Sequence, residues 1–174
     1  SSYRPSDIIK AYNWKTVDII NTDAEWRLVL ADAMSYISDN YELDYIMTIA
    51  TLTGACMYAI WYNYAWLMWN DKYVISKLLE QSKDNVEKYW ELPFWNFYIE
   101  KTKWEISDVK NLTEWVYAWA SMWAAFLANF CDKWEKFTHI DIAWVANYPE
   151  NYGLYTKWAT WFWVDSLSKL FMEL

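Results

Sequence analysis

The amino-acid sequence predicts an α/β fold, which we expect to be a three-layer α/β/α arrangement around a mostly parallel central sheet. Two observations lead to this prediction. Short apolar runs typical of buried strands recur along the chain, and segments with the apolar spacing of helices separate them. Parallel strands need such crossover segments, so the alternation indicates a parallel sheet. No repeat, low-complexity tract or linker divides the 174 residues, and we expect one structural unit.

The first half of the chain is expected to contain a hairpin, a helix and a strand. Residues 7–11 and 16–20 are apolar runs joined through an Asn-Trp pair, at a place where Asn-Gly would make the favoured hairpin turn. Residues 25–40 carry apolar side chains at helical spacing, which predicts a helix. Residues 44–50 form a short, nearly continuous apolar run, which predicts a strand buried on both faces.

The second half of the chain continues this alternation. Helical spacing predicts helices over residues 73–82, 95–103, 118–130 and 160–171. A further apolar run at residues 138–143 predicts another buried strand.

Composition and charge exclude several classes of protein. The net charge of −8 argues against a nucleic-acid-binding surface, which needs clustered Lys and Arg. No run of about 18 uncharged apolar residues occurs, so we expect no membrane span, and no secretion leader is visible. Two cysteines are too few for a disulfide framework and fit a reducing, cytoplasmic compartment. The chain begins with Ser1-Ser2 rather than Met, so we interpret it as a segment of a longer protein.

Glycine and tryptophan occur in abnormal numbers. Average glycine usage of about 7% predicts about 12 glycines in a chain of this length, whereas the sequence has 2 glycines and 16 tryptophans. Many of the tryptophans lie where glycine is expected, whereas Trp90 and Trp95 are interpreted as genuine and Trp104 and Trp134 are left open. Trp14 occupies the hairpin turn, and Trp158, Trp161 and Trp163 crowd a segment that would be a flexible loop if they were glycines. Indole-bearing residues do not readily adopt positive φ, whereas glycine does.

The candidate metal-binding and catalytic residues lie in the segment from Asn21 to Leu28, whose sequence is Asn-Thr-Asp-Ala-Glu-Trp-Arg-Leu. It follows a predicted strand and leads into a predicted helix, a place where side chains are presented at a sheet edge. From an extended backbone, Asp23 and Glu25 at i and i+2 would turn toward one point, and carboxylates suit divalent zinc, manganese or magnesium. Arg27 would hold an anion or stabilise developing negative charge. On spacing alone, the segment equally fits a solvated helix N-terminus whose acids complement the helix dipole.

With Trp26 read as glycine, this segment resembles the signature of the M17 leucyl aminopeptidase family. Further blocks resemble the family in the same order, at residues 3–7, 30–33, 50–55, 90–93, 108–111 and 139–143. The resemblance implies that residues 1–174 are the C-terminal portion of the family's catalytic domain, without the N-terminal domain and the first part of the catalytic domain.

The resemblance implies a two-metal site. Asp23 and Glu25 would be metal ligands, with Glu25 bridging two zinc or manganese ions. Arg27 would be catalytic, because it would help to hold a bicarbonate ion that acts as general base for the attacking water. Metal ions in such sites polarise the scissile carbonyl and lower the pKa of a bound water.

The resemblance also implies substrate-binding positions. The loop that positions the free amino end of the substrate would contain Thr51, Leu52 (through its backbone carbonyl) and Gly54. Ala120 and Met122 fall near the segment that lines the pocket for the N-terminal side chain. The remaining implied positions are Asn21 and Ala24.

The same resemblance suggests an origin for the tryptophans. Some uncultured bacteria read UGA as glycine, and a translation that reads UGA as tryptophan would produce this pattern; the alternative is a naturally tryptophan-rich protein. Twelve positions are interpreted as glycine, namely Trp14, Trp26, Trp61, Trp66, Trp69, Trp115, Trp119, Trp123, Trp144, Trp158, Trp161 and Trp163. Restoring them would give about 8% glycine, close to the average.

Family members carry further ligands, a lysine and two aspartates, and a catalytic lysine, at positions that precede this chain. Two carboxylates do not hold two ions with useful affinity, so we expect the chain alone to be inactive. Its parent is expected to be a metal-dependent aminopeptidase that releases N-terminal residues of the leucine type from peptides with a free N-terminus. The resemblance further implies a homohexamer.

The remaining histidine, cysteine and aspartate candidates are not interpreted as catalytic or metal-binding residues. His139, the only histidine, lies in a buried-strand pattern and is interpreted as a hydrogen-bonded structural residue rather than a metal ligand. Cys56 and Cys131 have no histidine nearby in sequence, which argues against a cysteine nucleophile. Asp32 and Asp141 are interpreted as structural.

A different functional class remains open. The chain would then be a catalytically dead relative that acts as a structural or DNA-binding regulatory protein, although the acidic balance argues against DNA binding. Twelve tryptophans in glycine positions would each cost about 1–3 kcal/mol. That total exceeds the usual stability of about 5–15 kcal/mol, so we expect a chain with twelve such tryptophans not to fold cleanly.

Overall fold

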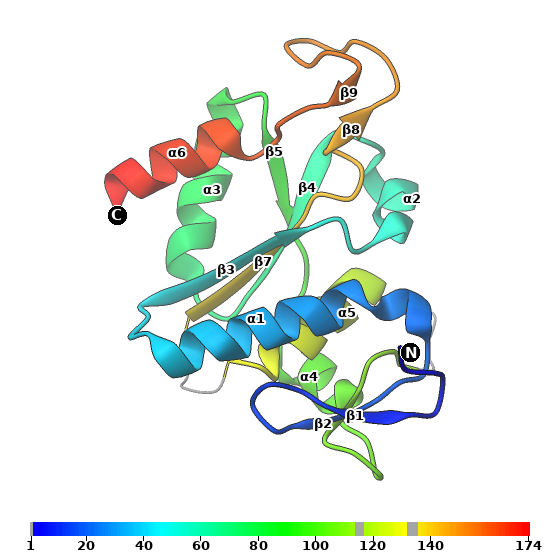
Figure 1. The fold of residues 1–174 in the computed structure, drawn as a ribbon. Helices are drawn as coiled ribbons and strands as arrows, with labels where there is room; N and C mark the ends of the chain where they lie inside the picture. The colour runs from blue at the N-terminus through cyan, green and yellow to red at the C-terminus, as the bar shows by residue number, and fades with distance from the viewer. Residues whose placement is uncertain (1, 114–116, 132–135) are drawn as a thin grey trace. The chain divides into compact units, whose positions relative to one another are not determined.

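Strands and helices alternate along the chain, and the predicted α/β fold is confirmed (Figure 1). The computed structural model describes residues 2–113, 117–131 and 136–174. The chain divides into two compact units, one formed by Ser1–Ile46 and Phe94–Phe137 and the other by Met47–Pro93 and Thr138–Leu174. Parallel strand pairing occurs in both units, and each of the two larger sheets also contains an antiparallel pair.

The first unit contains a three-stranded sheet and three helices. The sheet consists of the predicted hairpin, β1 (Ile8–Lys10) with β2 (Thr16–Asp18), and of β6 (Val109–Lys110), which runs parallel to β2. The helices are α1 (Trp26–Asn40), α4 (Asn96–Thr102) and α5 (Trp119–Ala128), and α5 contacts both α1 and α4.

Helix α1 follows the predicted range to within one residue. Leu28, Ala31 and Met34 are buried, so its apolar residues recur at three-residue steps along one face. Val29 and Tyr36 are exposed on the other side of the helix. The amphipathic pattern therefore determines which face of α1 packs against the core.

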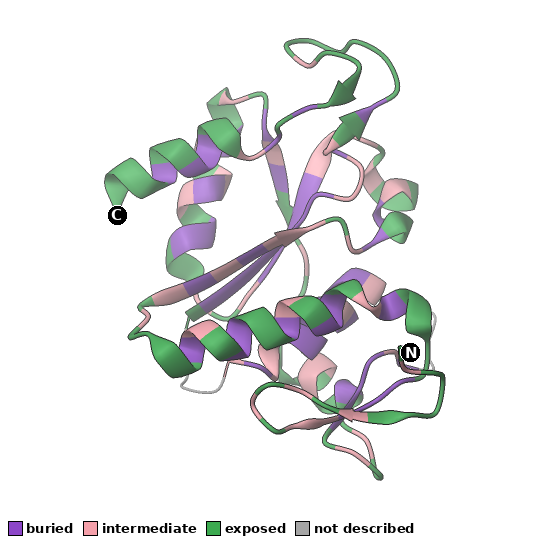
Figure 2. Cartoon of the chain, in the orientation of Figure 1, coloured by how far each residue is buried: buried purple, intermediate pink, exposed green. Residues whose placement is uncertain are grey.

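The second unit is built around a four-stranded sheet of order β3-β7-β4-β5. The strands are β3 (Tyr45–Ala50), β7 (Lys136–Asp141), β4 (Tyr64–Trp69) and β5 (Lys88–Glu91). Strand β4 runs parallel to β5 and antiparallel to β7. Helix α3 (Lys72–Asp84) packs against β4, β5 and α6 (Val164–Glu173). Figure 2 shows the buried residues concentrated along the central strands and on one side of these helices.

Short elements complete the second unit. The turn after β3 forms η2 (Gly54–Cys56) and α2 (Met57–Ile60), and β8 (Asn147–Tyr148) pairs with β9 (Trp158–Ala159) in an antiparallel hairpin. None of the helices in the described ranges combines the length and apolar character that a membrane crossing requires.

Several details differ from the sequence prediction, including the division into two compact units where one was expected. Strand β3 is buried at Ile46 and Thr48, but its other residues are only half-buried, so it is not covered on both faces. Helix α6 begins at Val164 rather than at residue 160. Thr160 instead forms a turn, because its hydroxyl donates to the Val145 carbonyl at 2.5 Å and accepts from the Phe162 amide at 3.2 Å.

Positive φ angles concentrate at the anomalous tryptophans. Among the described residues, seven non-glycine residues have positive φ, and five of these are tryptophans. They are Trp14 (70°), Trp61 (61°), Trp158 (83°), Trp161 (56°) and Trp163 (93°). All five belong to the twelve positions interpreted as glycine, and Trp61 combines its φ with a ψ of −147°, a region used essentially by glycine. Trp115, another of the twelve, lies outside the described residues.

Asp108 connects the β1–β2 hairpin to the segment that precedes β6. Its Oδ2 accepts hydrogen bonds from the Thr16 amide and the Thr16 hydroxyl, both at 2.7 Å. These bonds favour the ionised form and lower the pKa of Asp108. An Asp with a lowered pKa stabilises the fold above its ordinary pKa, and this stabilisation is lost as the pH falls through the lowered value.

We therefore expect Asp108→Asn to lower the melting temperature at pH 7 and to have a diminishing effect as the pH falls below about 4. Melting curves of both chains between pH 3 and pH 7 measure this. A difference in melting temperature that stays constant with pH would contradict the assigned role of the carboxylate.

Candidate metal and substrate site

The predicted metal segment lies between β2 and α1. Residues Thr22–Ala24 form a 3-10 turn, η1, and the Asn21 side chain caps it by accepting a hydrogen bond from the Asp23 amide at 2.9 Å. Glu25 continues in helical conformation, with φ −75° and ψ −35°. The predicted extended backbone is therefore wrong. Side chains at i and i+2 of a helical turn do not face each other, so the backbone does not by itself bring the two carboxylates together.

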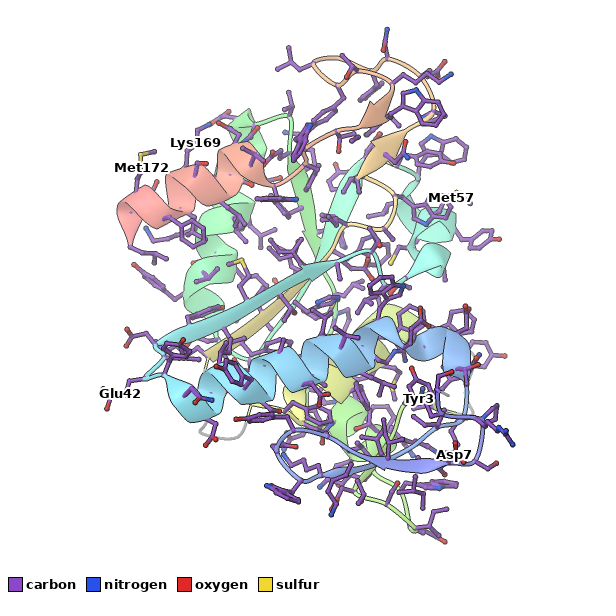
Figure 3. The ribbon with its side chains drawn as sticks, in the orientation of Figure 1. Tyr3, Asp7, Glu42, Met57, Lys169 and Met172 are labelled. Carbon is purple, nitrogen blue, oxygen red and sulfur yellow. The ribbon has the colours of Figure 1, made fainter. Side chains whose placement is uncertain are left out.

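Both carboxylates are nevertheless available to a cation. Asp23 is exposed and Glu25 is half-buried. Glu25 occupies the N-cap position of α1, yet its side chain makes no capping hydrogen bond. Its charge lies near Tyr3, labelled in Figure 3, and raises the pKa of that phenol in addition to the larger effect of burial.

The donor set fits part of a metal site. Carboxylate oxygens are suitable ligands for zinc, manganese and magnesium. In the part of the chain that the structure describes, however, no group of three or more His, Cys, Asp or Glu residues is placed to hold an ion. Zinc alone usually takes four ligands, so Asp23 and Glu25 would need ligands from elsewhere.

Arg27 lies in the first turn of α1 and is only 4% exposed. Its Nη1 donates a hydrogen bond to the Asn111 carbonyl at 2.7 Å. The guanidinium carbon lies 4.0 Å from the ring centroid of Trp123, a stacked cation–π contact. One face of the guanidinium group is therefore covered by an indole at a position interpreted as glycine.

Asn111 was not predicted as a site residue, yet it bonds to Asn21 and Arg27 of the candidate segment. Its side-chain oxygen accepts from the Ile20 amide at 2.8 Å and from the Asn21 amide at 3.3 Å. Its side-chain nitrogen donates to the Asn21 carbonyl at 2.7 Å. The block at residues 108–111 contributed to the family resemblance, but nothing in the sequence indicated a contact with residues about 90 positions earlier.

The predicted substrate loop belongs to the second unit and follows β3. Thr51 and Gly54 are exposed and Leu52 is half-buried. The Leu52 amide donates to Asp141 Oδ1 at 3.2 Å, and the Ala143 amide donates to the same oxygen at 3.1 Å. Asp141, interpreted as structural, thus holds the substrate loop.

Trp144 covers the same loop. Its indole Nε1 donates to the Gly54 carbonyl at 2.5 Å. Position 144 is one of the twelve interpreted as glycine, and a glycine there would remove this bond and leave the Gly54 carbonyl with the Met57 amide as its donor. Tryptophans at 123 and 144 therefore contact two of the predicted site residues.

Ala120 and Met122 are both buried in α5. Met122 lines a cavity of about 190 Å³, whereas Ala120 does not. The other lining residues are Phe97, Tyr98, Lys101, Tyr117 and Ala118. The lining is mainly apolar, as expected of a pocket for an apolar side chain.

His139 and Cys56 are both buried, as expected of structural residues. His139 is fully buried in β7, and its Nδ1 lies 2.8 Å from the Thr48 hydroxyl. Cys56 is buried, and burial, reinforced by the nearby charge of Asp141, raises the pKa of its thiol. A protonated thiol is a poor nucleophile and a poor metal ligand.

Removing the Asp141 carboxylate is expected to destabilise the chain. Asp141→Ala leaves the Leu52 and Ala143 amides without this acceptor, at a cost of about 2–6 kcal/mol for two such groups. Asp141→Asn is expected to cost less, because its amide oxygen still accepts. Chemical denaturation measures both, and Asp32→Asn is the control, because exposed Asp32 accepts one amide hydrogen bond, from Tyr12 at 2.8 Å.

The pH dependence provides a separate check on Asp141. Burial raises the pKa of Asp141 above its ordinary 3.8. The contribution of Asp141 to stability is therefore largest below pH 3.8 and declines as the pH rises through its raised pKa. Asp141→Asn should lack this decline; an identical pH profile in both chains would exclude the buried carboxylate as its source.

The match to a family model identifies this chain as part of a peptidase catalytic domain. The chain belongs to the cytosol aminopeptidase family, because residues 1–168 match the family model described as "Cytosol aminopeptidase family, catalytic domain". The family resemblance predicted from the sequence is thereby confirmed.

Several curated relatives are similar over most of the chain. A probable cytosol aminopeptidase of Persephonella marina is 42% identical over 172 residues, which is 99% of this chain and 34% of the relative. The corresponding protein of Aquifex aeolicus is 40% identical over 175 residues, which is 100% of this chain and 35% of the relative. That of Chlorobium luteolum is 42% identical over 143 residues, covering 82% and 28%. The chain thus spans about a third of the length of these relatives.

Proposed function

We propose that the chain is part of a two-metal aminopeptidase that releases N-terminal amino acids of the leucine type from peptides with a free N-terminus. The observation that carries this proposal is the family match over residues 1–168, which includes the segment with both carboxylates and the arginine. The matched relatives are named probable cytosol aminopeptidases.

In this proposal the first unit supplies part of the metal site. Asp23 and Glu25 hold the ions, and the remaining ligands come from the part of the family's domain that this chain does not span. Bound zinc or manganese would polarise the scissile carbonyl and lower the pKa of a water molecule. Arg27, fixed by its hydrogen bond to the Asn111 carbonyl, presents a positive charge to a bicarbonate ion.

The second unit supplies the loop for the amino end of the substrate. The Leu52 amide is bonded to Asp141. Because the amide N–H and the preceding carbonyl point in opposite directions in a trans peptide, the Thr51 carbonyl is directed away from Asp141. The Leu52 carbonyl is the proposed acceptor for the ammonium group at the amino end of the substrate. The cavity beside Met122 is the proposed pocket for the N-terminal side chain.

The proposal requires glycine at the anomalous tryptophan positions. Five of the twelve have positive φ. Two others obstruct the proposed site, because Trp123 stacks on Arg27 and Trp144 bonds to the Gly54 carbonyl. If these tryptophans are real, the same contacts favour the second candidate, a catalytically dead relative.

The first experiment is to read the codon at position 26 and to measure the mass of the native peptide that contains Glu25 and Arg27. A UGA codon and a glycine mass support the proposal, whereas a UGG codon and an indole mass favour the dead relative. The full-length gene product with glycine at the twelve positions is then assayed on leucine p-nitroanilide, with and without a chelator. N-acetyl-leucine p-nitroanilide is the control, because a blocked amine should not be hydrolysed. Absence of chelator-sensitive activity would overturn the proposal.

A further inference from the structure

Asn111 bonds to both ends of the candidate metal segment. Its side chain takes the Asn21 amide as a donor and the Asn21 carbonyl as an acceptor, at 3.3 and 2.7 Å. Its backbone carbonyl accepts from Arg27 at 2.7 Å, and its backbone amide donates to the Asp18 carbonyl at 3.0 Å. One residue therefore connects the end of β2, the turn that bears the carboxylates, and the first turn of α1.

These bonds continue to the backbone of the turn that bears the carboxylates. Asn21, held on both sides of its backbone, caps η1 through its side chain, which accepts from the Asp23 amide. The path from Asn111 to Asp23 thus passes through two consecutive hydrogen-bonded side chains. Glu25 follows directly and opens α1, whose first turn contains Arg27.

The environment makes these bonds difficult to replace. Asn111 is only 1% exposed, so water does not readily substitute for the lost side chain. A buried amide or carbonyl that loses its partner is costly, and the Asn111 side chain serves three backbone groups of Ile20 and Asn21.

The first unit also contains a comparable asparagine away from this segment. The Asn129 side-chain nitrogen donates to the Thr102 hydroxyl and the Ala125 carbonyl, both at 2.8 Å, at the C-terminal end of α5. Asn129 is therefore also an asparagine whose side chain bonds to neighbouring groups, but it is half-buried, acts there as a donor, and does not bond to residues 18–27. Comparing variants of Asn111 and Asn129 therefore distinguishes a general contribution to stability from a specific effect on the candidate metal segment.

We propose that Asn111 is a positioning residue that holds Asn21, Asp23, Glu25 and Arg27 in the arrangement that binds metal and anion. The inference rests on the proposed function for the identity of these ligands. It does not depend on that function for the claim that Asn111 holds the turn. Mutation of a residue that hydrogen-bonds to and orients metal ligands typically lowers metal affinity or activity by about 10–100-fold.

The test uses the full-length gene product with glycine at the twelve tryptophan positions. Asn111→Ala is compared with Asn111→Asp, which keeps the oxygen acceptor and loses the donor, and with the control Asn129→Ala. The readouts are amide hydrogen exchange of residues 20–25 without metal, Mn²⁺ affinity by calorimetry, kcat/KM and melting temperature.

We expect Asn111→Ala to speed exchange of residues 20–25 and to weaken Mn²⁺ binding and kcat/KM by about 10–100-fold. Asn111→Asp should lie between wild type and Asn111→Ala. Asn129→Ala should lower the melting temperature while leaving exchange of residues 20–25 and Mn²⁺ affinity unchanged.

Wild-type exchange and Mn²⁺ affinity in Asn111→Ala would overturn the positioning role. Failure of the proposed function is distinguishable, because the parent protein would then lack Mn²⁺ binding and activity. Hydrogen exchange would in that case still decide whether Asn111 holds the turn.

Discussion

Replacing Trp61, Trp158 and Trp161 together by glycine is expected to raise the free energy of unfolding by about 3–6 kcal/mol. Their φ angles are 61°, 83° and 56°. A residue with a Cβ atom pays about 1–2 kcal/mol in the left-handed region, which glycine avoids. The three side chains are 64%, 66% and 72% exposed, so removing them forfeits little hydrophobic burial. Strain relief therefore outweighs lost contacts.

Denaturant unfolding of the two chains measures this difference. Trp90→Gly is the matched control, because Trp90 is 54% exposed, lies within β5 and is not among the positive-φ residues. Glycine within a strand costs about 0.5–1 kcal/mol, so the control should lose stability while the triple variant gains it. A loss of stability in both would mean that the tryptophans are accommodated as native residues.

The second large effect is expected at Glu25. In the full-length protein with glycine at the twelve positions, Glu25→Gln removes the charge proposed to bridge the two ions. Stabilisation of charge by a bound metal is worth several kcal/mol, and a loss of about 4 kcal/mol corresponds to about a 10³-fold fall in kcat. Steady-state hydrolysis of leucine p-nitroanilide and metal content per chain measure the effect.

Stability distinguishes a lost ligand from a damaged fold. Because Glu25 is half-buried and does not cap α1, Glu25→Gln should leave the metal-free melting temperature nearly unchanged. Glu42→Gln is the matched control, since Glu42 is exposed and labelled in Figure 3 at the turn after α1. It should keep both metal and activity. Full metal content in Glu25→Gln would exclude Glu25 as a ligand.

The elements with strong local patterns were predictable from the sequence. Helix α1 has an uninterrupted amphipathic spacing, and its observed bounds, Trp26–Asn40, agree with the prediction to within one residue. Strand β4 was not predicted as a strand, because Trp66 and Trp69 were interpreted as glycines that punctuate the segment. The short pairings of β6, β8 and β9 depend on distant partners and have no periodicity to reveal them.

The candidate site was predictable in its residues but not in its geometry. The carboxylates and Arg27 were recognised from their order, yet the backbone between Asn21 and Glu25 proved helical rather than extended. A local hydrogen bond donated by the Asp23 amide to the Asn21 side chain stabilises that conformation, and such caps compete with extended structure. The bonds from Asn111 cross about 90 residues, a separation over which a single sequence carries no pairing signal.

The environment of Cys56 has a practical consequence for chemical labelling. Alkylating reagents react with thiolates, and Cys56 is buried with a raised pKa. The second cysteine of the chain, Cys131, is half-buried. A maleimide dye added to the folded chain should therefore attach at Cys131, in the unit that carries the carboxylates, and leave the segment beside the substrate loop unmodified.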